Sequence, residues 1–108
     1  MKYLLLIYLD EKALSESERQ TCYEESLQLA QEIHSRGQYL GANPLYPTAM
    51  ATSVRVREGK RSVTDGPFAE TREQLGGYFL IETENLDEAI AVAERIPMAR
   101  KGTVEVRP

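Results

Sequence analysis

Residues 65–82 read DGPFAETREQLGGYFLIE, a long loop that leads into an apolar strand. The loop takes the first 12 residues of this stretch, and loops of that length in small domains are usually functional or mobile. Its composition predicts an ordered loop, because Gly66 allows unusual dihedral angles, Pro67 fixes its own φ, and Phe68 can anchor the turn in apolar surroundings. The strand that follows, residues 77–82, is apolar on both faces, which is typical of strands buried on two sides.

A long helix is predicted earlier in the chain, after a first apolar strand at residues 3–9. Ser15 and Glu18 have the spacing of a capping box, in which each side chain satisfies a free backbone N–H at the helix start. Gly37 ends the helix in the left-handed conformation that glycine adopts at low cost. One broad apolar face is predicted from the spacing of Tyr23, Leu27, Ala30 and His34, with Cys22, Leu29 and Ile33 beside them.

A hairpin is predicted between this helix and the loop. Residues 53–57 and 60–64 alternate at period two, and Glu58-Gly59 offers a tight turn between them. Because one of its faces is polar, the hairpin is expected at the edge of the sheet. Residues 38–50, which contain two prolines, predict an irregular extended strand before it.

The C-terminal part of the chain predicts a second helix and a last strand. Asn85 has the character of a helix cap, and Pro97 is expected to end the helix. Residues 104–107 form the last strand. The apolar face of this helix is predicted from Leu86, Ala89, Ile90, Ala93 and Ile96.

This order of elements predicts an α+β fold, a ferredoxin-like split βαβ antiparallel sheet with an added hairpin, as a single domain over residues 1–108. Both helices of such a fold lie on one face of the sheet. The strands at 3–9 and 77–82 are nevertheless apolar on both faces, so the second face needs a cover. A second copy would supply it, which predicts a homodimer. The alternative is that the long hairpin folds over that face within one chain.

Composition narrows the classes of function. The chain is 42% hydrophobic and 28% charged with a net charge of −4, so it is an ordinary globular protein with no general attraction to nucleic acid. Its single cysteine excludes a disulfide within the chain and favours a reducing, cytoplasmic location. The apolar run at residues 3–9 is too short for a signal peptide or membrane span and is interpreted as a core strand.

Residues 65–82 strongly resemble the signature of the DGPF-motif proteins within the YCII-related superfamily. The resemblance extends over nearly the whole chain. It implies a ferredoxin-like fold that dimerises in the manner of the dimeric α/β-barrel superfamily, with a small-molecule cleft between sheet and helices. It implies no known reaction, and members of the family are often encoded beside extracytoplasmic-function sigma factors. The other matching segments are residues 1–8, 54–57, 59–60, 86–89, 96–97 and 104–108.

The candidate catalytic residue is Asp65. Related YCII proteins are thought to pair a histidine with an aspartate near this turn, but His34, the only histidine, lies further along its helix than that pairing requires. Two roles remain open for Asp65. It is either a desolvated general acid or base in the cleft, or a cap that accepts backbone N–H groups of its own turn.

Two classes of function follow from these residues. The first is a small-molecule enzyme, a lyase or isomerase that uses Asp65, by analogy of fold. The second is a non-catalytic ligand-binding or regulatory accessory protein linked to sigma-factor signalling. No metal site and no cofactor are predicted, because neither ligand spacing nor a glycine-rich phosphate loop is present. The candidate ligand-binding residues are Tyr8, Arg55, Gly66, Pro67, Phe68, Gly76 and Gly77.

Overall fold

The computed structural model describes residues 1–108 and contains two α-helices, six strands and two short 3-10 helices. Four of the strands form one antiparallel sheet in the order β2-β5-β1-β6, and the other two pair only with each other. The elements in chain order are β1 (Lys2–Leu9), α1 (Glu16–Ser35), β2 (Tyr39–Pro44), η1 (Thr48–Met50), β3 (Thr52–Arg57), β4 (Lys60–Asp65), β5 (Gln74–Glu82), α2 (Leu86–Ala93), η2 (Pro97–Arg100) and β6 (Thr103–Arg107).

The four-stranded sheet has the predicted split βαβ topology. The central strand β1 is antiparallel to β5 on one side and to β6 on the other, and β2 lies outside β5. A bulge between Ile7 and Tyr8 interrupts the register of β1 with β5. The prediction of an α+β, ferredoxin-like fold is therefore confirmed.

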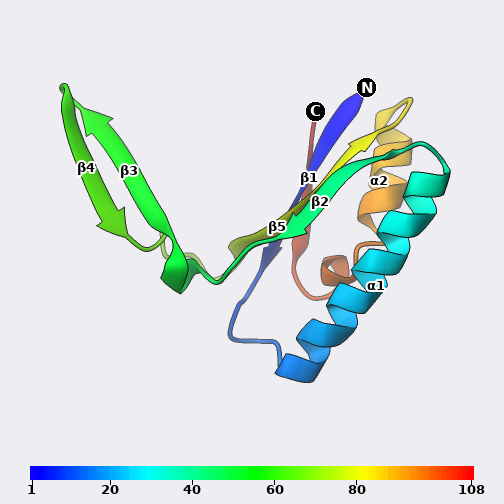
Figure 1. Ribbon diagram of the computed structural model, residues 1–108, viewed down its shortest axis with the longest axis horizontal. Helices are drawn as coiled ribbons and strands as arrows, with labels where there is room; N and C mark the ends of the chain where they lie inside the picture. Colours follow the sequence, from blue (N-terminus) through cyan, green and yellow to red (C-terminus); the bar gives the residue numbers. More distant parts are fainter.

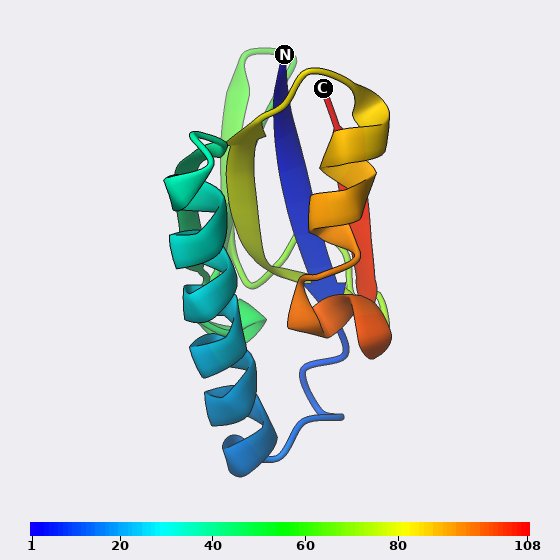
Figure 2. The same cartoon turned by 90° about the vertical axis from the view of Figure 1, so that its right-hand side faces the viewer.

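The hydrophobic core lies between the sheet and the two helices, which cover the same face (Figures 1 and 2). Alternate residues of the two central strands point into it, because successive side chains of a strand face opposite sides. Leu5 and Ile81 are fully buried, as is Ile33 of α1. The core consists of Tyr3, Leu5, Ile7, Leu29, Ile33, Phe79, Ile81, Ala89, Val92, Ala93, Ile96 and Met98.

Helix α1 begins and ends where the sequence predicts. The Ser15 hydroxyl accepts the N–H of Glu18, and the Glu18 carboxylate accepts the N–H of Ser15. Gly37 follows the helix with φ of +73°. The predicted apolar face is only partly correct. Leu29 and Ile33 are buried, whereas the side chains predicted to lead that face, Tyr23, Leu27 and His34, are exposed.

Helix α2 is shorter than its predicted apolar face. The Asn85 side chain accepts the N–H of Glu88, which confirms the cap. The helix ends at Ala93, before Pro97, and Pro97 opens η2 instead of stopping α2 directly. Of the predicted face, Ala89, Ala93 and Ile96 are buried, but Leu86 and Ile90 are exposed.

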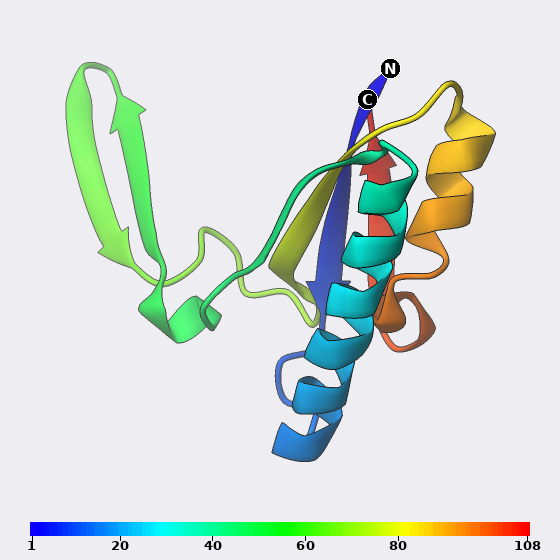
Figure 3. The ribbon, with the colours of Figure 1, turned by 45° about the vertical axis from the view of Figure 1, so that its right-hand side comes forward.

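The β3-β4 hairpin forms with the predicted turn, but not at the edge of the sheet. It is a separate two-stranded sheet that stands away from the body of the molecule (Figures 1 and 3). The segments on either side of it, residues 45–51 and 66–73, lead the chain away from the main sheet, so the hairpin cannot pair with β2. It also does not fold over the free face of its own sheet, which was the alternative to a dimer.

The face of the sheet opposite the helices is uncovered and apolar at its centre. Leu4 and Leu6 of β1 point to it, as do Tyr78 and Leu80 of β5, because each alternates with a core residue. These four side chains are partly exposed. We call them the open face. Neither α1 nor α2 has the length and hydropathy of a membrane-spanning segment.

Candidate functional site

A pocket of about 340 Å³ lies between α1 and the edge of the sheet formed by β2 and β5. Its residues come from the end of β1 and the loop after it, from α1, from β2 and the segment that follows, from β5, and from the region of η2. Core residues such as Phe79, Ile96 and Met98 contribute to its lining. Of its 22 lining residues, 14 are hydrophobic, so the pocket suits a mainly apolar occupant.

The pocket explains why apolar residues of α1 are exposed. Tyr23 and Leu27 line the pocket and are 46% and 61% exposed. Leu45, on the segment after β2, lines it too and is 43% exposed. Three large apolar side chains gathered around one cavity form an exposed hydrophobic surface of the kind that usually marks a binding site.

Two glycines let the strands approach closely beside the pocket. A Cβ atom on Gly76 would lie 2.1 Å from the Leu9 side chain, and one on Gly77 would lie 3.0 Å from the carbonyl oxygen of Asn43. The Gly76 carbonyl accepts the N–H of Leu45 at 2.9 Å, which fixes the segment after β2 against β5. Both glycines line the pocket, and the space that a side chain would take at each is filled by the protein's own chain.

Three charged or amide side chains line the pocket, and two of them have hydrogen-bond partners within the protein. The Glu11 carboxylate accepts two hydrogen bonds from Thr48, one from its N–H at 2.9 Å and one from its hydroxyl. The Asn43 amide donates to the Tyr78 hydroxyl at 3.0 Å. Arg19 is the other charged residue in the lining, and its guanidinium takes part in no hydrogen bond or ion pair with the protein.

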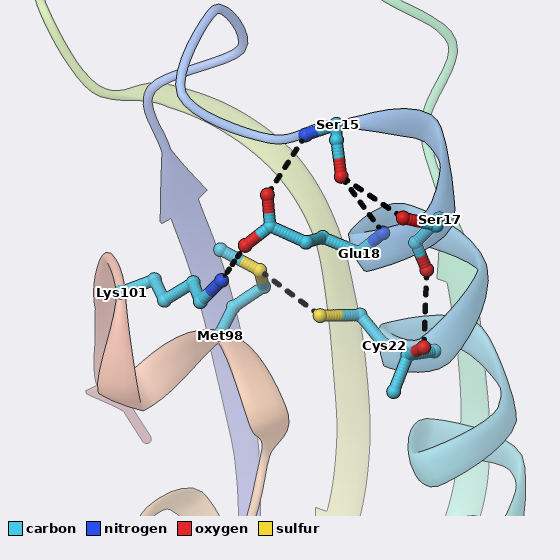
Figure 4. A network of polar contacts seen from close by, with 7 residues as sticks. Ser15, Ser17, Glu18, Cys22, Met98 and Lys101 are labelled. Atoms are coloured by element: carbon cyan, nitrogen blue, oxygen red, sulfur yellow. Dashed lines mark hydrogen bonds and ion pairs between the residues drawn. The ribbon is translucent and has the colours of Figure 1, made fainter.

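A polar network ties the start of α1 to the end of η2, next to the pocket (Figure 4). Lys101 pairs with Glu18, and this contact, together with the hydrogen bonds from Ser15, lowers the pKa of Glu18 from 4.5 to about 2. Beside it, the Cys22 thiol lies 3.7 Å from the Met98 sulfur. Burial raises the pKa of the Cys22 thiol, so this unpaired cysteine is a weak nucleophile at neutral pH.

Comparison with known proteins places the chain in a family. The chain matches the YCII-related domain over residues 1–108. It belongs to the YCII-related family. This YCII-related chain is also 36% identical, over 113 aligned residues, to the uncharacterised protein R00369 of Rhizobium meliloti (strain 1021). That alignment covers 100% of the chain and 91% of the relative.

The turn at residues 65–68 lies outside the pocket. Asp65 is the last residue of β4, paired across the hairpin with Thr52, and its side chain is exposed. Its carboxylate accepts no hydrogen bond, so the capping role expected for it is not found. The turn is held instead by Gly66, whose N–H donates to the Ala51 carbonyl and whose carbonyl accepts the Ser53 hydroxyl, each at 2.7 Å.

The rest of the signature loop is ordered by a glutamine. The Gln74 amide donates to the carbonyls of Ala69 and Thr71, each at 3.1 Å. Phe68 was expected to anchor the loop, but its side chain is 80% exposed. The aromatic ring does not find apolar surroundings because the loop runs between the hairpin and the sheet, away from the core.

The other predicted ligand-binding residues are spread over the molecule. Gly76 and Gly77 line the pocket, whereas Gly66, Pro67 and Phe68 do not. Tyr8 points to the side of the sheet opposite the helices, and Arg55 lies on the exposed hairpin. His34 is exposed, with its ring edge-on to Tyr39 at a centroid distance of 6.1 Å.

Sequence reasoning missed most of the pocket. Arg19 lies one turn into α1, directly after the capping box, and belongs to no binding motif. Tyr23 and Leu27 did carry a signal, since both stand in the predicted apolar stripe of the helix. That stripe was predicted only as one apolar face of the helix, and the pocket shows why part of the face is apolar without being buried.

Proposed function

We propose that this YCII-related protein binds a small, mainly apolar molecule in the pocket between α1 and the sheet. The observation that carries the proposal is the cluster of exposed apolar side chains, Tyr23, Leu27 and Leu45, at the mouth of a cavity of about 340 Å³. That volume falls at the lower end of the range typical of ligand pockets. Exposed apolar side chains are costly in water, and an apolar ligand would cover these three.

The proposal is one of binding and does not rely on catalysis by Asp65. A lyase or isomerase that uses Asp65 rests on analogy of fold, and the side chain is exposed and outside the lining of the pocket. A general acid or base must reach the proton that it transfers. Ligand binding, the function common to the enzymatic and the regulatory hypotheses, is what the pocket favours.

We also propose that the protein is a homodimer that covers the open face. Two features of the structure support a second copy as the partner. The open face is apolar and faces the side on which the hairpin stands (Figure 1). Val54, Val56 and Val63 of the hairpin are more than half exposed, although an isolated two-stranded hairpin is only marginally stable in water.

Charge supports the same partner. The hairpin, residues 52–65, carries four basic and two acidic side chains, a net charge of +2. The rest of the chain carries nine basic and 15 acidic side chains, a net charge of −6. Each copy therefore has a basic hairpin, and the rest of its chain is acidic, so the hairpin of one copy is attracted to the rest of the other. In a closed two-fold dimer both hairpins can make this contact.

Titration with octanol, a neutral and mainly apolar probe, tests the pocket. Binding is followed by the NMR chemical shifts of labelled methyl groups in the protein. We expect the largest shifts at Ile96 and Met98, which line the pocket. Leu27→Glu should weaken binding about tenfold, because it replaces an apolar contact by a charge. Ile90→Glu makes the same kind of change at an exposed site of α2 outside the pocket and should leave the affinity unaltered. Shifts confined to Leu4 and Leu6 would place the probe on the open face and contradict the proposal.

A further inference from the structure

Two charged side chains, Glu11 and Arg19, line the pocket, and they differ in whether the protein already supplies their hydrogen-bond partners. Both oxygens of Glu11 accept hydrogen bonds from Thr48, so its carboxylate is already engaged. The guanidinium of Arg19 has five N–H donors and gives none of them to a protein acceptor. In a lining in which 14 of 22 residues are hydrophobic, this is the one charged donor group without a partner.

An unpaired guanidinium beside an apolar cavity selects the charge of the ligand. Its planar fork matches the two oxygens of a carboxylate, and charge-assisted hydrogen bonds of this kind are about twice as strong as neutral ones. A cationic ligand would be repelled by Arg19, and a neutral ligand would gain no ion pair with it. We propose that the pocket recognises small apolar molecules that carry one carboxylate, and that Arg19 binds the carboxylate; this rests on the proposed function.

The remaining lining limits the ligand to a single negative charge. Arg19 is the only basic residue in the pocket, and the only other charge is the acidic one of Glu11. A second carboxylate would therefore find no second cation in the lining, and a position near Glu11 or against the apolar residues would be unfavourable. The apolar body of the ligand would lie along the hydrophobic lining, with Phe79 and Met98 among its contacts.

Octanoate and octanol form a matched pair that tests the charge. The two share an apolar chain and differ in the carboxylate, and their affinities for the full chain are measured by calorimetry near neutral pH. We expect octanoate to bind the wild type at least about tenfold more tightly than octanol. Arg19→Gln should remove this preference by weakening octanoate alone, and Arg19→Lys should retain part of it, because an ammonium keeps the charge but loses the fork.

The control is Arg36→Gln, which removes the same charge from the exposed end of α1 outside the pocket and should leave the preference intact. Circular dichroism of each variant checks that it is folded. Equal affinities of octanoate and octanol in the wild type, or a preference that survives in Arg19→Gln, would overturn the assignment of Arg19 while leaving the apolar pocket supported. Failure of both probes to perturb Ile96 and Met98 would overturn the proposed function itself.

Discussion

At the scale of single residues, the signals that act over three or four positions predicted the structure well. The capping box of Ser15 and Glu18 and the cap at Asn85 form as expected, because both partners lie on the same turn of chain. Asp65 shows the opposite case. Its role depends on where the hairpin carries it, and that is decided by contacts distant in sequence.

The contact between Glu18 and Lys101 predicts a low pKa for one carboxyl group. Glu18 should titrate near pH 2, below its ordinary 4.5. Because the folded-state pKa is lowered, the stability that this group contributes is present above about pH 4.5 and is lost as the pH falls toward 2. Titration of the carboxyl carbon by NMR measures the pKa directly.

Lys101→Met should raise the pKa of Glu18 toward its ordinary value, and the hydrogen bonds from Ser15 should keep it from returning fully. Thermal unfolding at neutral pH should change little, since exposed ion pairs contribute little to stability. Lys12→Met removes an exposed cation that forms no ion pair and serves as the control. A pKa of Glu18 that is insensitive to Lys101→Met would show that the pair does not form in solution.

At the scale of elements, strands were easier to predict than the face of a helix. A run that is apolar on both sides, as in β1 and β5, indicates a central strand, and both strands do lie in the middle of the sheet. In α1, by contrast, apolar residues serve two purposes. Leu29 and Ile33 pack in the core, whereas Tyr23 and Leu27 line the pocket. The periodicity of the sequence is the same for both pairs, so it does not distinguish the two roles.

Two glycines, Gly102 between η2 and β6 and Gly41 in β2, should differ sharply in how much an alanine substitution lowers stability. A Cβ atom on Gly102 would lie 2.1 Å from the carbonyl oxygen of Tyr8, a backbone atom that cannot move aside without disturbing β1. Gly102→Ala should therefore cost about 1–3 kcal/mol of unfolding free energy. A Cβ atom on Gly41, in β2, would have no neighbouring atom within 4 Å, so Gly41→Ala should change stability by less than about 0.5 kcal/mol.

Urea unfolding of the two variants beside the wild type measures both effects, because a shift in midpoint at constant slope reports stability. The two substitutions add the same methyl group, so a common effect of alanine on the unfolded chain cancels between them. Equal stabilities would mean that the chain around Tyr8 relaxes freely, and would contradict the close contact of β1 with the start of β6.

At the scale of the whole molecule, the topology was predictable and the position of the hairpin was not. The order of the elements is enough to specify a split βαβ sheet. Whether an added hairpin extends the sheet or stands apart depends on the segments that join it, and residues 45–51 and 66–73 carry no periodic pattern that fixes their direction. For the same reason the pocket could not be predicted from the sequence, because Leu45, which lines it, lies on the first of these segments.

The open face and the hairpin together predict the oligomeric state. Wild-type protein at micromolar concentration should sediment at twice the 12.2 kDa of one chain, because a second copy removes the apolar face from water. Leu6→Lys places a charge at the centre of that face and should give a folded monomer, since the side chain does not point into the core of its own chain. Ile90→Lys, the same change at an exposed site of α2, should remain a dimer.

Hydrogen exchange in the hairpin separates this assembly from one that uses another surface. If the hairpin of one copy packs against the rest of the other, the backbone amides of β3 and β4 are protected in the dimer, although an isolated hairpin opens readily. Leu6→Lys should then speed their exchange without altering that of the core strand β1. A wild-type chain that stays at 12.2 kDa well above micromolar concentration would refute the dimer. A wild-type dimer whose hairpin amides exchange as fast as those of Leu6→Lys would support the homodimer but show that the hairpin is not part of its interface.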